Sequence, residues 1–159
     1  MRELLVISIF IAACSPSTAD NAPPSESAAV VASAQLATDT ITVYKTPTCG
    51  CCANWVDHVR KHGYHVVAID QNDLTDVKRR LGVPQQLSAC HTATVGGYVV
   101  EGHVPAPDIA RLLSERPAVA GIAVPGMPMG SPGMEGLYSE RYEVVTFDKA
   151  GATKVFASH

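Results

Sequence analysis

The fold and the chemistry of this chain are indicated by one stretch, residues 41–52, Ile-Thr-Val-Tyr-Lys-Thr-Pro-Thr-Cys-Gly-Cys-Cys. Its β-branched and aromatic start predicts a strand, and Pro47 predicts a turn. A helix is expected from about Gly50 to Lys61, ending before Gly63. Three thiols therefore fall at a helix N-terminus, where unpaired N–H groups and the helix dipole stabilise thiolate. Thiolate is the form that exchanges disulfides and binds soft metals.

The remaining pattern alternates strands and helices. Strands are expected at residues 65–69, 91–95 and 98–101, and helices at 74–81 and 107–115. The pair Gly96-Gly97 predicts a hairpin between the last two strands. This order belongs to the α/β class and predicts a thioredoxin-like fold. Residues 121–136 are rich in Gly and Pro and predict an irregular loop, and residues 142–147 and 153–156 predict a C-terminal β-hairpin.

The first 39 residues differ from the rest. Residues 1–13 are predicted to be a signal segment, because the apolar run is too short to span a bilayer. It ends in Ile11-Ala12-Ala13-Cys14, which resembles the lipobox of bacterial lipoproteins, and this predicts a lipidated Cys14 and a periplasmic, membrane-anchored protein. Ser15, which is not Asp, favours the outer membrane by analogy with known sorting. The alternative is an ordinary secretory signal. Residues 14–39 predict a flexible tether, and residues 40–159 one folded domain.

Four cysteines belong to this domain: Cys49, Cys51, Cys52 and Cys90. Outside the cytoplasm they could form structural disulfides. A second reading is thiol–disulfide exchange, with Cys49 as nucleophile and Cys52 as resolving thiol. Two features favour metal instead: dithiol exchange does not need Cys51, and the expected fold places the loop with Cys90 opposite Cys49 and Cys52. Cu(I) suits such thiolates best, Zn(II) is an alternative, and a structural zinc module is a further one.

Four segments carry a resemblance to a known family: residues 44–52 (YKTPTCGCC), 90–93 (CHTA), 97–106 (GYVVEGHVPA) and 125–135 (PGMPMGSPGME). Together they resemble the CopG-like family of small periplasmic metal-binding proteins, over roughly residues 41–156. The resemblance implies a thioredoxin-like fold, a role in copper handling or resistance, and copper bound by the four domain cysteines. Because four sulfurs can be shared, more than one Cu(I) ion in a thiolate-bridged cluster is expected as a variant. Conversion between the oxidation states of copper, as a copper oxidoreductase would perform, is a secondary hypothesis.

Histidines near the cysteines are further candidates. His103 follows the second hairpin strand and is a candidate metal ligand or proton carrier; the alternative is a hydrogen-bonded turn residue. His91 directly follows Cys90, and strand alternation predicts that it faces away from the pocket. His58 and His62 lie four residues apart on a helix, and a solvated face is expected there.

Three methionines in the Gly- and Pro-rich segment, Met127, Met129 and Met134, are candidate soft ligands for Cu(I). The Met-Pro-Met spacing favours an entry or transfer site on a loop. The alternative is a lid of apolar side chains over the core.

The charge of the chain limits its partners. Net charge is −3 and the sequence pI is about 6.0. Nucleic-acid binding requires clustered Lys and Arg, so nucleic acid is not expected as a partner. The expected partners are copper ions, other periplasmic copper-handling proteins, and the membrane through the lipid.

Overall fold

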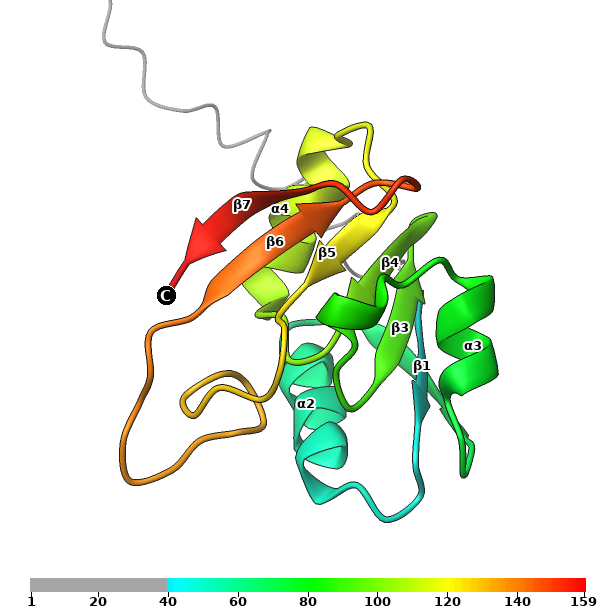
Figure 1. The fold of residues 1–159 in the computed structure, drawn as a ribbon. Helices are drawn as coiled ribbons and strands as arrows, with labels where there is room; N and C mark the ends of the chain where they lie inside the picture. Colours follow the sequence, from blue (N-terminus) through cyan, green and yellow to red (C-terminus); the bar gives the residue numbers. More distant parts are fainter. Residues whose placement is uncertain (1–39) are drawn as a thin grey trace, which may run out of the picture.

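A seven-stranded mixed sheet forms the centre of the computed structural model, which describes residues 40–159 (Figure 1). The strand order is β2-β1-β3-β4-β5-β6-β7. The strands are β1 (Thr40–Lys45), β2 (His65–Asp70), β3 (Thr92–Val95), β4 (Tyr98–Glu101), β5 (Gly121–Ala123), β6 (Glu143–Phe147) and β7 (Thr153–Ser158). The helices are α2 (Gly50–Lys61), α3 (Thr75–Arg80), the short 3-10 helix η1 (Gln85–Leu87) and α4 (Ala106–Glu115). The alternating α/β pattern expected for residues 41–115 is confirmed.

The local connections follow from the sequence. Strands β1 and β2 are parallel, which requires a crossover, and α2 supplies it. Strands β3 and β4 are antiparallel and joined by Gly96-Gly97, both with positive φ, as a tight hairpin turn demands. Helix α2 ends at Lys61, and Gly63 follows with φ +92°, a conformation that only glycine adopts without strain. The cysteine segment therefore lies between the end of β1 and the first turn of α2.

The sheet buries a different set of side chains on each face. One face packs against α2 and α4, and its buried cluster includes Val43 of β1, Val56 of α2, Val100 of β4 and Leu112 of α4. The other face carries a smaller cluster of Leu87, Val99, Ala123 and Phe147. Adjacent residues of β4 alternate between the two clusters, as the period of a strand requires. The cysteine-bearing end of α2 is thus fixed by its apolar face against the larger cluster.

One expectation about the fold is wrong: residues 121–123 are strand β5 and not loop. This strand pairs in parallel with β4 and antiparallel with β6, so the C-terminal hairpin β6–β7 continues the central sheet. The strand has a glycine at position 121 because a side chain would not fit there. A Cβ there would overlap the carbonyl oxygen of Val99 and lie 2.8 Å from the ring of Phe147.

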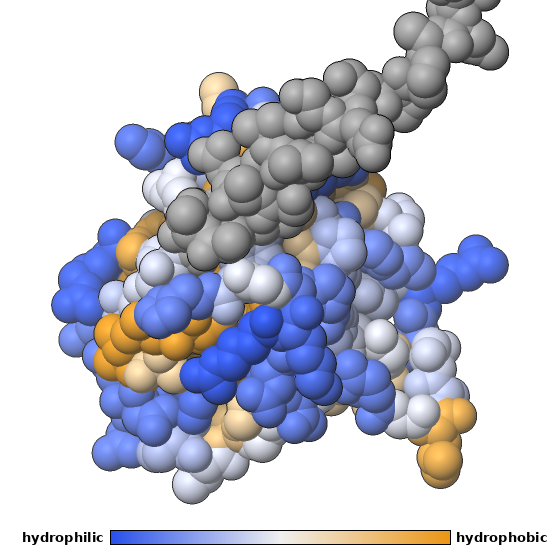
Figure 2. All heavy atoms as spheres, turned by 180° about the vertical axis from the view of Figure 1, so that it is seen from behind, coloured by the Kyte–Doolittle hydropathy of each residue, from blue (hydrophilic) through white to orange (hydrophobic). Residues whose placement is uncertain are grey.

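The long segment between β5 and β6 runs beside α2 (Figure 1). Seen from behind, the surface is mainly hydrophilic with separate hydrophobic areas (Figure 2). Among residues 40–159, none of the helices has the length and apolar character needed to cross a bilayer. The predicted signal segment, Cys14 and the tether lie outside the described residues.

Candidate metal centre

The first turn of α2 holds three of the four cysteines. Cys49 is the N-cap residue, and its sulfur accepts a hydrogen bond from the backbone N–H of Cys52 at 3.3 Å. Cys49 and Cys52 are joined by a disulfide. Cys52 is fully buried, whereas Cys49 is half-buried. In this state the two residues cannot act as thiolate ligands, so metal binding by all four cysteines requires reduction of this bond.

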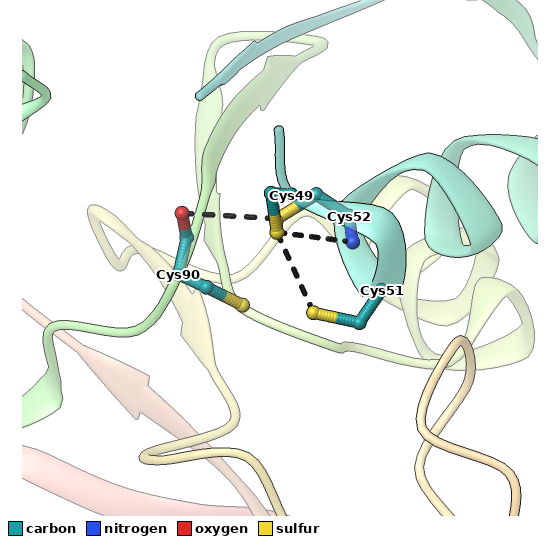
Figure 3. A group of neighbouring side chains, drawn as sticks. All are labelled: Cys49, Cys51, Cys52 and Cys90. Atoms are coloured by element: carbon teal, nitrogen blue, oxygen red, sulfur yellow. Dashed lines mark hydrogen bonds between the residues drawn. A yellow bond between two sulfur atoms is a disulfide. The ribbon is translucent and has the colours of Figure 1, made fainter. Parts of the chain in front are cut away.

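The other two cysteines are free thiols that face the disulfide. The sulfur of Cys51 lies 3.4 Å from that of Cys49. Cys90 comes from the bend before β3, and its sulfur points toward Cys51 (Figure 3). All four sulfurs lie within 4.8 Å of one another. Burial, and after it the neighbouring Cys51, raises the pKa of the Cys90 thiol to about 12. The sequence-based expectation that Cys90 faces the cysteines of α2 is therefore confirmed.

His103 joins the same group from the segment after β4. It is fully buried, and its Nε2 lies 2.8 Å from the sulfur of Cys90. Its Nδ1 lies 2.8 Å from the carbonyl oxygen of Pro132. Because a carbonyl oxygen only accepts, Nδ1 carries the proton. Burial lowers the pKa of His103, so the ring is neutral at pH 7 and Nε2 keeps a lone pair toward Cys90.

The expectation that His91 faces away from the pocket is wrong. His91 is fully buried, and its Nδ1 lies 3.8 Å from the sulfur of Cys90. Its ring centroid is 4.4 Å from that of Trp55 and 5.0 Å from that of His103. The alternation rule fails because Cys90 and His91 precede β3, which begins at Thr92. Burial, with the nearby His103, lowers the pKa of His91 well below its ordinary value.

The segment between β5 and β6 covers this group through its backbone. Besides the carbonyl of Pro132, Gly133 approaches α2 closely: a Cβ there would lie 2.6 Å from the oxygen of Cys51 and 2.8 Å from the nitrogen of Trp55. The three candidate methionines belong to this segment. Met127 is 53% exposed, and Met129 and Met134 are half-buried. Their role as copper contacts stays a prediction.

His58 and His62 have local hydrogen bonds. Nε2 of His58 accepts from the backbone N–H of Ala106 at 3.1 Å. Nδ1 of His62 lies 2.8 Å from the carbonyl oxygen of His58. His62 is exposed, as expected, whereas His58 is half-buried.

A buried carboxylate near Cys90 was missed by the sequence reasoning. Glu101 is fully buried and accepts hydrogen bonds from the ammonium of Lys78, the hydroxyl of Thr92 and the backbone N–H of Ala89. Burial raises the pKa of Glu101, and the Lys78 ammonium partly opposes that rise. These bonds hold both flanks of the Cys90–His91 pair. The sequence does carry a signal for this residue, since Glu101 is a charged residue at the end of the otherwise apolar strand β4.

The donor set fits a soft or borderline metal ion. Four sulfurs converge at the end of α2, and a second group shares one of them, formed by Cys90, His91 and His103. Thiolate and imidazole together suit copper or zinc, whereas Mg²⁺ and Ca²⁺ prefer oxygen ligands. The fold and the site define the class: a small α/β protein with a cysteine- and histidine-rich candidate metal centre.

Comparisons with known proteins agree with this class. Two solved structures, both of a copper resistance protein CopG, are similar to the chain. The one described as form 2 has a TM-score of 0.72 and 44% identity, covering 76% of this chain and 98% of the other. Form 1 has a TM-score of 0.71 and 45% identity, covering 76% and 96%. The chain therefore belongs to the CopG-like family.

A family model described as a protein of unknown function, DUF411, matches residues 87–134. This range includes Cys90, His91 and His103 but ends short of the cysteines of α2. A search of curated proteins found no match.

Proposed function

We propose that this chain binds Cu(I) through the thiolates of Cys49, Cys51, Cys52 and Cys90 and serves copper resistance. The observation that carries the proposal is the convergence of four sulfurs within 4.8 Å of one another. Sulfurs this close can each bridge two ions, so a multinuclear cluster is part of the proposal. The copper resistance proteins that the chain resembles support copper over zinc. His103, Met127, Met129 and Met134 are proposed as accessory ligands, with the methionines at an entry site.

The fold is proposed to be thioredoxin-like. The order β2-β1-β3-β4, with β1 and β2 parallel and β3 and β4 an antiparallel hairpin, supports this. The cysteines follow β1 at the N-terminus of α2, where such folds carry their reactive dithiol. For cellular location we propose a periplasmic lipoprotein, anchored through Cys14 and exchanging copper with other periplasmic copper-handling proteins.

Copper redox conversion is a second part of the proposal. When Cys49 and Cys52 form their disulfide, two electrons and two protons leave the dithiol. Two Cu(II) ions would each take up one electron and become Cu(I). Recovery of the dithiol then needs a reductant, such as a thiol donor. Oxidant-driven copper loss that no thiol reductant reverses would count against this part.

The rival function is thiol–disulfide exchange without copper. The disulfide between Cys49 and Cys52 is the observation in its favour, together with the greater exposure of Cys49. Cys49 thiolate would attack a substrate disulfide, releasing one substrate thiol and forming a mixed disulfide. Cys52 would then attack the sulfur of Cys49 and displace the second substrate thiol, leaving the enzyme oxidised and the substrate reduced. This mechanism does not need Cys90.

Metal content decides between the two. The whole chain is reduced, loaded with Cu(I) without oxygen and desalted, and copper, zinc and free thiols are measured together. One or more coppers per chain, with all four domain thiols protected, is the expected result. Cys90→Ser should weaken copper binding sharply while the serine hydroxyl keeps a hydrogen bond to His103. No retained copper, with disulfide reductase turnover that survives in Cys90→Ser, would favour the rival.

A further inference from the structure

Cys90, His91 and His103 form a second group of ligand atoms, all within 4.8 Å of one another. The sulfur of Cys90 lies 2.8 Å from Nε2 of His103 and 3.8 Å from Nδ1 of His91. Ligand atoms around one ion with bonds of 2.0–2.3 Å are separated by roughly 3.6 Å. The two spacings from the Cys90 sulfur therefore differ from a coordination geometry by less than about 1 Å. Unlike Cys49 and Cys52, none of these three residues takes part in the disulfide.

The orientation of His103 is that of a metal ligand. Its Nδ1–H donates to the carbonyl oxygen of Pro132, and this bond fixes both the tautomer and the ring plane. Metal-binding histidines are commonly held in this way, with one ring nitrogen on the metal and the other donating to a carbonyl or carboxylate. The free lone pair on Nε2 then points at the sulfur of Cys90.

His91 is fully buried, and one of its two ring nitrogens lacks a hydrogen bond within the described part of the chain. Its Nδ1 is 3.8 Å from the sulfur of Cys90, and its Nε2 has no hydrogen-bond partner within residues 40–159. The ring instead packs against that of Trp55. The indole N–H of Trp55 donates to the carbonyl oxygen of Val104 at 2.8 Å and is therefore not a partner for His91. Buried polar groups are nearly always satisfied. An imidazole that turns Nδ1 toward a thiol and leaves a buried Nε2 without a hydrogen bond therefore points to a ligand.

We infer that Cys90, His91 and His103 are a nitrogen–sulfur copper subsite that stays intact when Cys49 and Cys52 form their disulfide. The inference rests on the proposed copper function and names where copper stays in the oxidised chain. A disulfide removes two thiolates from the four-sulfur site, whereas it leaves this subsite with one thiol and two imidazoles. One cysteine with two histidines is a ligand set that holds copper in both oxidation states.

The subsite predicts that copper binding survives loss of the α2 cysteines. The full chain is prepared as Cys49→Ser/Cys52→Ser and as a triple variant that adds Cys51→Ser. Each is reduced, loaded with Cu(I) without oxygen and desalted. We expect one copper per chain in both variants, and X-ray absorption of the triple variant should show nitrogen and one sulfur around copper. A triple variant without copper, next to wild type that holds copper, would overturn the subsite and leave the proposed function standing. Wild type without copper would overturn the proposed function itself.

The histidines are tested in the same triple background. His103→Asn keeps a donor for the carbonyl of Pro132 but removes Nε2, and His91→Phe keeps the ring against Trp55 but removes both nitrogens. Each should lower Cu(I) affinity about tenfold or more, measured against a chromophoric Cu(I) chelator. His62→Asn, at an exposed histidine, is the control and should change nothing. Unchanged affinity in both His103→Asn and His91→Phe would overturn the inference.

If the triple variant fails to fold, the subsite is tested in oxidised wild-type protein. The chain is kept oxidised, with the disulfide between Cys49 and Cys52 verified by mass spectrometry, and loaded with Cu(I). One copper with nitrogen scattering in the X-ray absorption spectrum is expected. Copper surrounded by sulfur alone, or lost while the reduced protein retains it, would contradict the subsite.

Discussion

Gly133 packs on the first turn of α2 so closely that a Cβ would lie 2.6 Å from the carbonyl oxygen of Cys51. The same residue has φ +85°, which L side chains rarely adopt. Its neighbour Pro132 accepts the hydrogen bond from His103, so the position of this segment and the orientation of that ring are linked.

Gly133→Ala is expected to displace the segment between β5 and β6 from α2. Backbone strain and the steric clash together should cost about 2–3 kcal/mol of the free energy of unfolding. Copper affinity should fall as well, because His103 loses the carbonyl that orients it. Gly126→Ala is the matched control: its φ is +74° but a Cβ there meets nothing within 4 Å. Chemical denaturation and chelator competition measure both effects, and equal losses in the two variants would show that the close approach is unimportant.

Glu101→Gln tests the buried network around Cys90. The variant leaves the Lys78 ammonium without its carboxylate and places an amide where three donors converge, so a loss of about 3 kcal/mol in unfolding free energy is expected. Asp76→Asn breaks the exposed ion pair with Arg79 and should cost less than about 0.5 kcal/mol. Copper affinity should also fall in Glu101→Gln alone, because Ala89 and Thr92 flank the ligand-bearing pair.

The sequence predicts the elements whose signals are local. The turn at Pro47, the glycine after α2 and the hairpin at Gly96-Gly97 each determine backbone geometry within a few residues, and all three agree with the structure. The sequence also predicts that Cys90 faces the α2 cysteines, because the expected order of strands and helices places the loop before β3 opposite the start of α2.

Other features depend on contacts between distant segments. The glycine at position 121 predicts a loop, yet Gly121 lies in a strand. It is glycine because β4 and β6 leave no room for a side chain there. Glu101 is buried with partners from three separate segments, which periodicity in one strand does not reveal. His91 turns inward because the chain bends before β3 begins. The disulfide between Cys49 and Cys52 is one of two redox states that the same sequence allows.

Intrinsic fluorescence should report copper binding. Trp55 is the single tryptophan of the chain, it is fully buried, and its ring lies 4.4 Å from that of His91. Copper bound by His91 and Cys90 would lie beside the indole and quench its emission. A titration of wild type with Cu(I) should quench in step with the first copper bound. Stoichiometric copper binding with unchanged emission would place the metal away from His91.

Copper affinity should rise with pH because binding displaces the proton of Cys90. Burial raises the pKa of this thiol to about 12, so it is protonated throughout the neutral range and must lose its proton to bind copper as thiolate. Protons compete with copper, and each one released changes the apparent affinity about tenfold per pH unit at any pH below the pKa. Burial lowers the pKa of His103, so this ring is already neutral and releases no proton when copper binds. Chelator competition from about pH 7 to about pH 8 should therefore give a slope of log affinity against pH that is larger by one in wild type than in Cys90→Ser. Identical slopes in the two proteins would mean that Cys90 does not bind copper as thiolate.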